Sequence, residues 1–148
     1  MAASRVKRFQ ELQEERTRTF HDLEKAHKKF LGHAPNYENG FDDFKKSVSN
    51  CTDIFKRISN EIIEIKADLD KDESGQDYGE LVGKVQELEQ KKLQTVVDVQ
   101  LARQQALDNP GDELCEKNAR LIQVGLNKLG EDITEKLTDI RYKLADQE

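Results

Sequence analysis

Residues 41–69 read FDDFKKSVSNCTDIFKRISNEIIEIKADL. Apolar residues recur in this stretch every seven positions, in two rows that lie three residues apart. The positions concerned are Phe41, Phe44, Val48, Cys51, Phe55, Ile58, Ile62, Ile65 and Leu69. A 3.5-residue period is typical of a helix that packs lengthwise against another helix, with side chains interlocking along the contact. The stretch therefore predicts a long helix with a helical neighbour.

The composition extends this expectation to the whole chain. Of 148 residues, 35% are apolar and 36% are charged, and there are only two prolines. This composition is typical of long amphipathic helices, so we expect an all-α protein. The length predicts a single helical domain over residues 1–148. The net charge of −6 argues against a protein that coats nucleic acid.

Apolar periodicity predicts four helices, over residues 4–31, 41–70, 79–108 and 110–144. The short joints between them make sequential helices antiparallel neighbours. Two arrangements satisfy this pattern: a closed up-down-up-down bundle with coiled-coil-like packing, or two hairpins stacked into an elongated rod. The bundle is favoured because each helix carries an apolar stripe that must be buried.

Helix-capping residues set these predicted starts. Asn39 and Asn109 are the candidate N-caps of the second and fourth helices, and Pro110 suits the first helical position after Asn109. Asp77 and Glu80 have the spacing of a capping box for the third helix. The residues between the second and third helices are polar and are expected to form a linker.

Polar residues interrupt two of the apolar stripes. Arg16 and Thr19 occupy stripe positions in the first helix, and Lys92 and Thr95 do so in the third. The match to the complete stripe of residues 41–69 is therefore imperfect, and we expect a weak tendency to form a homodimer. The fourth helix has a continuous stripe made of Cys115, Ala119, Ile122, Leu126, Leu129, Ile133, Leu137, Ile140 and Leu144.

The sequence predicts a nuclear or cytoplasmic protein that is not secreted and does not enter a membrane. Charged residues, among them Arg5, Arg8 and Glu11, interrupt any apolar run that could serve as a signal peptide. No stretch approaches the roughly 18 apolar residues that span a bilayer. Cys51 and Cys115 are expected to be reduced thiols in the protein interior.

One acidic segment resembles part of a calcium site. Asp70, Asp72 and Ser74, followed by Gly75, match the first half of an EF-hand loop. The glutamate needed at position 12 is missing, because Leu81 stands there. We therefore expect a solvated acidic turn and predict no metal site.

Catalysis and cofactor binding have little support. His21 and His27 do not share a helix face, and His33 lies in a predicted loop. The sequence contains no paired cysteines at metal-binding spacing and no glycine-rich phosphate loop that follows a strand. We predict no catalytic residues, no cofactor-binding residues and no enzymatic activity.

Direct binding of nucleic acid is also disfavoured. The first helix is rich in arginine and lysine, but its bases alternate with acids at pairing distance, as in Glu14 with Arg18 and Glu24 with Lys28. This pattern is typical of a solvated helix face. We expect protein partners to be bound through helical surfaces instead.

Several segments together resemble a known family. The densest likeness is QLARQQA at residues 100–106, followed by DNPG at 108–111. Further segments are EER at 14–16, FL at 30–31 with APNY at 34–37, LEQKKL at 88–93 and RY at 141–142. The chain resembles the DNA-repair "required for excision" B (Rex-one-B) family of small helical proteins. The resemblance implies a role in excision repair of damaged DNA, with no assigned enzymatic activity and no established site residues.

Two classes of function follow from these observations. The first is a non-enzymatic adaptor or scaffold that takes part in excision repair through protein partners. The second is a structural coiled-coil component of a multiprotein assembly, such as a cytoskeletal one, that is unrelated to DNA. Relocalisation of the protein to damaged chromatin would distinguish the first class from the second.

Overall fold

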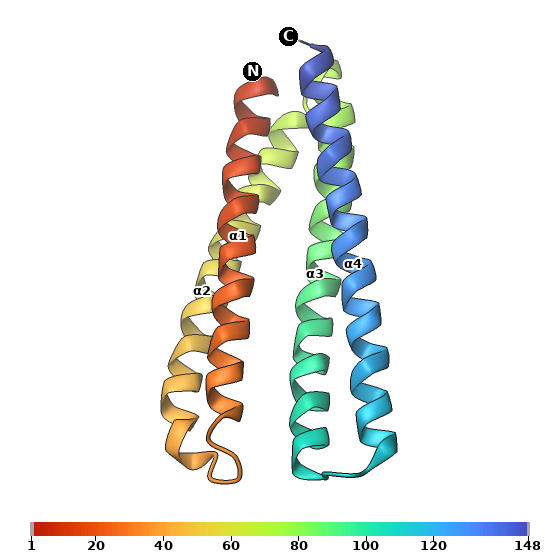
Figure 1. Cartoon of the computed structure of the whole chain (residues 1–148). Coiled ribbons are helices and arrows are strands. Elements are labelled where there is room, and N and C mark those ends of the chain that lie inside the picture. Colours follow the sequence, from red (N-terminus) through yellow and green to blue (C-terminus); the bar gives the residue numbers. More distant parts are fainter. Residues whose placement is uncertain (1, 148) are drawn as a thin grey trace. The chain divides into compact units, whose positions relative to one another are not determined.

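The computed structural model describes residues 2–147, which fold into four helices without strands (Figure 1). The helices are α1 (Ala2–Leu31), α2 (Glu38–Leu69), α3 (Glu73–Asp108) and α4 (Glu113–Asp146). The predicted all-α class is therefore confirmed. The chain divides into two compact units, of which the first ends at Gly79 and the second begins at Glu80. Within residues 2–147, no helix is long and apolar enough to cross a membrane.

The first unit is built on α1 and α2, which pack side by side in opposite directions (Figure 1). Six of the nine predicted stripe positions in α2 are buried: Cys51, Phe55, Ile58, Ile62, Ile65 and Leu69. Phe44 and Val48 are half-buried, whereas Phe41 is 51% exposed. The stripe therefore forms much of the core, and its packing loosens only at the N-terminal end of α2.

Two aromatic pairs join α1 to α2. The rings of Phe20 and Phe55 lie with centroids 4.7 Å apart, and those of Phe30 and Phe44 stack with centroids 4.6 Å apart. Aromatic pairs at such distances contribute about 0.5–1.5 kcal/mol beyond the burial of their surface. They anchor the middle of the hairpin and the end nearest its loop.

Helix α2 begins earlier than the sequence predicted. It starts at Glu38, so Asn39 lies inside the helix and is not its N-cap. The preceding loop is already coiled by backbone hydrogen bonds, since the Gly40 N–H donates to the Tyr37 carbonyl at 3.0 Å. Gly40 also allows a close approach, because a Cβ atom there would collide with the His33 ring. These local bonds extend the helix to the N-terminal side of the predicted start.

Helix α3 also begins earlier, at Glu73 instead of residue 79. Asp72 Oδ1 accepts hydrogen bonds from the Ser74 hydroxyl at 2.7 Å and from the Gly75 N–H at 3.0 Å, so Asp72 caps the helix. Asp77 and Glu80 lie inside α3 and form no capping box at its start. Tyr78, expected in a linker, is fully buried in this first stretch of the helix.

In the second unit, α3 and α4 form an antiparallel hairpin (Figure 1), in which Arg103 Nη2 donates to Gln123 Oε1 at 2.7 Å. Helix α4 begins at Glu113, so the predicted start at residue 110 is wrong. Its N-cap is Asp112, whose Oδ1 accepts from the Leu114 N–H at 3.0 Å. Asn109 instead ends α3, because its side chain donates to the Gln105 carbonyl at 2.8 Å. Gly111 reverses the chain between them with a φ of 83°.

The predicted stripe of α4 faces inward, but it is only partly covered. Ile133 and Ile140 are buried, whereas Cys115, Ala119, Ile122, Leu126, Leu129, Leu137 and Leu144 are half-buried. The apolar residues of helix α3 are buried more completely, as Val82, Val85 and Val99 show. The apolar surface of α4 is therefore shielded less well from solvent than that of the other helices.

Polar residues occupy part of the buried face of α1. Arg16 and Thr19 are each only 3% exposed, so both interruptions of the stripe point into the protein. The Arg16 guanidinium donates to Gln13 Oε1 at 3.0 Å, and the Thr19 hydroxyl donates to the Glu15 carbonyl at 2.8 Å. Such bonds are needed because a polar group that is buried without a partner is costly.

Candidate functional site

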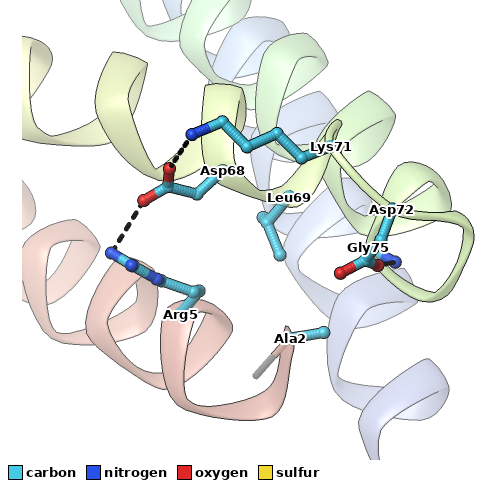
Figure 2. Close-up of a pocket in the computed structure, with 7 residues that line it drawn as sticks. All are labelled: Ala2, Arg5, Asp68, Leu69, Lys71, Asp72 and Gly75. Carbon is cyan, nitrogen blue, oxygen red and sulfur yellow. Dashed lines mark hydrogen bonds and ion pairs between the residues drawn. The ribbon is translucent and has the colours of Figure 1, made fainter.

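A cavity of about 220 Å³ lies where α2 ends and α3 begins, beside the first turn of α1 (Figure 2). Its lining residues are Ala2, Arg5, Asp68, Leu69, Lys71, Asp72 and Gly75. The cavity is therefore built from the first unit alone. Four of its lining side chains are charged, so it is a candidate for a polar binding site in that unit.

Asp68 joins the two basic residues of this cavity. Its carboxylate oxygens lie 2.9 Å from Arg5 Nη1 and 3.2 Å from Lys71 Nζ, as the dashed lines in Figure 2 show. All three side chains are partly exposed, so each pair stabilises the fold by about 0–1 kcal/mol. The bridge ties the start of α1 to the end of α2, and its carboxylate partly neutralises the charge available for an anionic ligand.

Asp72, the second acid of the cavity, serves the helix that follows it. The Ser74 hydroxyl and the Gly75 N–H donate to its carboxylate and hold the pKa of Asp72 below its ordinary value. A carboxylate at a helix N-terminus also interacts favourably with the helix dipole. Asp72 is therefore a structural cap that stays ionised near neutral pH.

The structure does not bring the half EF-hand motif together as a calcium loop. Asp70 Oδ2 lies 2.6 Å from Lys66 Nζ, while Asp72 caps α3. Because α3 begins at Glu73, the residues that would form the later positions of the loop are helical. Across residues 2–147, no three His, Cys, Asp or Glu side chains are grouped so that they could hold a metal ion.

The three histidines lie in different surroundings. His27 is buried, with its ring centroid 5.7 Å from that of Phe44 and 6.5 Å from that of Phe30. His33 packs against Gly40 in the loop between α1 and α2, and His21 is exposed. The structure therefore does not gather them into a catalytic or metal-binding cluster.

The two cysteines are free thiols, as expected. Burial raises the pKa of Cys51, whose thiol lies 3.8 Å from the Thr19 carbonyl oxygen. Partial loss of solvent and the Asp112 carboxylate raise the pKa of Cys115. Because the thiolate is the reactive form, both shifts lower the nucleophilicity of these thiols near neutral pH.

Some bases of α1 pair with acids, and two of these acids, Glu61 and Asp68, lie on α2. Arg8 Nη2 donates to Glu61 Oε1 at 2.9 Å, and this interaction raises the pKa of Arg8 and lowers that of Glu61. In another pair the base, Arg57, lies on α2 and the acid, Glu15, lies on α1. Within α1, Lys28 lies 4.0 Å from Glu24, as the spacing predicted. These pairs support the interpretation of α1 as an ordinary solvated face, although its bases outnumber its acids.

Comparison with known proteins identifies the family. The family model described as "DNA repair REX1-B" matches residues 4–103, which include nearly all of α1, all of α2 and most of α3. The chain belongs to the REX1-B family. The resemblance noted in the sequence is therefore confirmed, and the name of the family indicates a role related to DNA repair.

Two curated relatives of this REX1-B chain are named "Required for excision 1-B domain-containing protein". The one from Bos taurus is 29% identical over 137 residues, which cover 93% of this chain and 73% of the relative. The one from Mus musculus is 30% identical over 141 residues, which cover 95% of this chain and 79% of the relative. No solved structure matches the chain.

Sequence reasoning missed the residues that shape the cavity. The bridge from Arg5 through Asp68 to Lys71 joins the beginning of α1 to the end of α2, and no local pattern marks it. The cap at Asp72 did have a signal, because an aspartate two residues before Ser74 and three before Gly75 is typical of an N-terminal turn.

Proposed function

We propose that this REX1-B family member acts in excision repair as a non-enzymatic helical adaptor that works through protein partners. The observation that carries the proposal is the match of the family model over residues 4–103. The name shared by the two relatives, "Required for excision", supports the same process. A nuclear or cytoplasmic location would suit this role.

The geometry supports an adaptor more than an enzyme. Catalysis requires a nucleophile, acid or base that converges with its partners on one cleft. In the cavity beside α3, Asp68 is paired with Arg5 and Lys71, and Asp72 caps a helix. These side chains have structural roles that account for their positions.

The charges support protein partners more than direct reading of DNA. Tight binding to duplex DNA is driven by the release of counterions when a basic surface covers the phosphates. Here Arg5, Arg8 and Arg57 are engaged by carboxylates across the α1–α2 contact. We therefore expect weak DNA affinity that changes little when Arg18 or Lys25, which are both exposed, is replaced by glutamate.

The structural coiled-coil alternative has less support. A filament component needs a long apolar stripe that is free to meet other chains. In α2, six of the nine stripe positions are already buried. The longest regular stripe in the sequence is thus largely used in the core of the protein itself.

Cells that lack the protein provide the test. They should lose survival after ultraviolet damage, and wild-type protein should restore it. A variant carrying both Arg18→Glu and Lys25→Glu should restore survival equally well. Ile58→Asp, which places a charge in the core, should fail to restore it because the fold is lost. Normal survival without the protein would favour the structural alternative.

Purified protein provides the second arm of the test. Fluorescence anisotropy with damaged and undamaged duplexes near physiological salt should detect only weak, salt-sensitive binding. Tight binding to the damaged duplex, or its cleavage, would contradict the adaptor proposal. Proximity labelling in damaged cells would then identify the partners that the wild-type protein contacts and the Ile58→Asp variant does not.

A further inference from the structure

One segment of α4 carries basic residues and no acidic ones. Residues 117–130 read KNARLIQVGLNKLG and contain three bases, Lys117, Arg120 and Lys128, but no acid. The chain as a whole has a net charge of −6, and acids return immediately afterwards at Glu131 and Asp132. Lys117 and Arg120 are exposed, as is Lys128, which lies 3.1 Å from Asp132. The segment is therefore a local basic surface on an acidic protein.

The same part of α4 exposes large apolar side chains. Leu114 is 79% exposed, Leu121 is 61% exposed and Val124 is 64% exposed. Leu114 and Leu121 lie seven residues apart, and Val124 follows three residues later, so the three share one side of the helix. Lys117 and Lys128 complete the same heptad pattern. We call the row Leu114, Lys117, Leu121, Val124 and Lys128 the outer face of α4.

This outer face is distinct from the stripe that packs inside the protein. The inner stripe includes Ile122 and Leu126, which are half-buried, and Ile133 and Ile140, which are buried. Helix α4 thus carries two rows with apolar residues, of which the inner one is partly covered and the outer one is exposed. A second heptad row on a helix that is already packed is typical of a site for another helix.

Gly125 lies beside the outer face and leaves the backbone open there. A Cβ atom at Gly125 would meet nothing within 4 Å, so close packing inside this protein does not require glycine at that position. Glycine in a helix interior costs about 1 kcal/mol relative to alanine. Next to Leu121 and Val124, it allows a partner to approach the helix backbone closely.

We propose that the outer face of α4 binds an acidic amphipathic helix of a protein partner. Apolar side chains of that helix would cover Leu121 and Val124, and its carboxylates would meet Lys117 and Arg120, whereas Lys128 already pairs with Asp132. Charge complementarity of this kind sets partner choice in helix-to-helix recognition. This inference names the class of partner for the proposed adaptor function. The role of the site in cells rests on that function.

The same charges disfavour the other occupants of such a face. A second copy of this chain that docked through the same segment would bring two acid-free segments together, so that like charges approach one another. A nucleic acid would meet only three basic side chains around an apolar centre. So few phosphate contacts give weak, salt-sensitive binding. An acidic helix satisfies both the apolar row and its basic border.

Binding can be tested with the full chain and two synthetic helical peptides. Each peptide has about three heptads, with leucine at the a and d positions and with either glutamate or lysine at the flanking positions. Titration followed by nuclear magnetic resonance should show saturable binding of the glutamate peptide. Its affinity should exceed that of the lysine peptide by about tenfold or more, with signal changes centred on residues 114–128.

Variants on the surface of α4 make the test specific. Leu121→Glu combined with Val124→Glu should weaken binding of the glutamate peptide by about tenfold or more. Lys117→Glu combined with Arg120→Glu should reverse the preference between the two peptides. The matched control is Tyr142→Glu, which changes a side chain that is 69% exposed on the same helix outside the segment. All these positions are exposed, so unchanged thermal unfolding should verify that each variant is folded.

Several outcomes would overturn the proposal. These are equal binding of both peptides, no saturable binding up to about 1 mM peptide, or signal changes away from residues 114–128. Self-association that Leu121→Glu abolishes would identify a second copy as the occupant instead. If a DNA duplex, or vesicles of phosphatidylcholine and phosphatidylserine, bound more strongly than the glutamate peptide, nucleic acid or membrane would be the occupant of the outer face instead. Failure of the peptide test leaves the damage-survival assay unaffected, so the two proposals can fail separately.

Discussion

Phe20 of α1 and Phe55 of α2 meet ring to ring, with centroids 4.7 Å apart and ring planes inclined at 48°. Phe55 is also one of the heptad positions of α2, and it is 7% exposed. The contact therefore joins the periodic pattern of the sequence to the core of the first unit.

Replacing Phe55 with alanine should lower the free energy of unfolding by about 3–5 kcal/mol, because it leaves a cavity at this contact. Phe41→Ala is the matched control on the same stripe, and it should cost less than about 1 kcal/mol because that ring is half exposed. Urea denaturation of both variants provides the measurement. A loss below about 1 kcal/mol for Phe55→Ala would mean that the stripe does not form the core.

Two glycines should respond oppositely to alanine. At Gly75 a Cβ atom would collide with the Leu69 carbonyl oxygen, so Gly75→Ala should lower the free energy of unfolding by about 1–3 kcal/mol. At Gly125 the space is open, so Gly125→Ala should raise it by about 0.5–1 kcal/mol through helix propensity. Thermal or urea unfolding measures both. Equal effects at the two positions would contradict the packing described at the start of α3.

The pair between Arg8 and Glu61 predicts a dependence of stability on pH. The pKa of Glu61 is lower in the folded protein than its ordinary value of 4.5, because the Arg8 guanidinium donates to its carboxylate. The stabilisation is therefore fully present above about pH 4.5 and is lost as the pH falls through the folded pKa. Glu61→Gln should be less stable than wild type at pH 7, and the difference should shrink as the solution is acidified. In an Arg8→Gln background, the same substitution should show a much smaller pH dependence, because only the charge of Arg57 then lowers the pKa of Glu61. An undiminished pH dependence there would exclude the pair as its cause.

The acidic segment from Asp70 to Gly75 should not bind calcium tightly. Only half of an EF-hand coordination shell is encoded, and α3 begins at Glu73 where the loop would have to continue. Isothermal titration calorimetry with calcium should detect no site of micromolar affinity. Binding at that level, lost in Asp70→Ala, would disprove this prediction.

Weak self-association stays a prediction, and the structure suggests where to look for it. Most of the α2 stripe is buried, which leaves its N-terminal end, where Phe41 is exposed and Phe44 and Val48 are half-buried. Sedimentation equilibrium should show a small dimer fraction at high micromolar concentration, reduced by Phe41→Ser. A strict monomer under those conditions would rule the expectation out.

The parts of the fold that depend on periodicity could be predicted from the sequence, and those that depend on single turns could not. The burial of Ile58, Ile62 and Ile65 follows from a repeat that is visible without a structure. The start of α4 could not be predicted in this way, because Asn109 and Asp112 are both good capping residues. The choice between them depends on the positive φ of Gly111, which reverses the chain before the helix can begin.

Contacts between distant residues were likewise invisible in the sequence. Arg16 interrupts an apolar stripe, yet it is buried and donates to Gln13. Asp68 looks like an ordinary surface acid until α1 places Arg5 beside it. Such placements depend on which helix packs where, and a local pattern does not contain that information. The exposed row at Leu121 and Val124 was also missed, because the stronger inner stripe of α4 accounts for the same helix.

The ion pairs between α1 and α2 also help to set the register of one helix against the other. Along α1 the charges at Arg5, Arg8 and Glu15 are positive, positive and negative. Their partners on the antiparallel helix α2, which are Asp68, Glu61 and Arg57, have the complementary charges in the same order. Sliding α1 by one heptad toward the C-terminus of α2 would set Arg8 beside Asp68, but it would leave Arg5 beside Gly75 and set Glu15 beside Glu64, where like charges repel. Apolar stripes alone tolerate such a slip, because they repeat every seven residues. The surface charges, although each pair is weak, thus favour the observed register over those that the apolar repeat alone would accept.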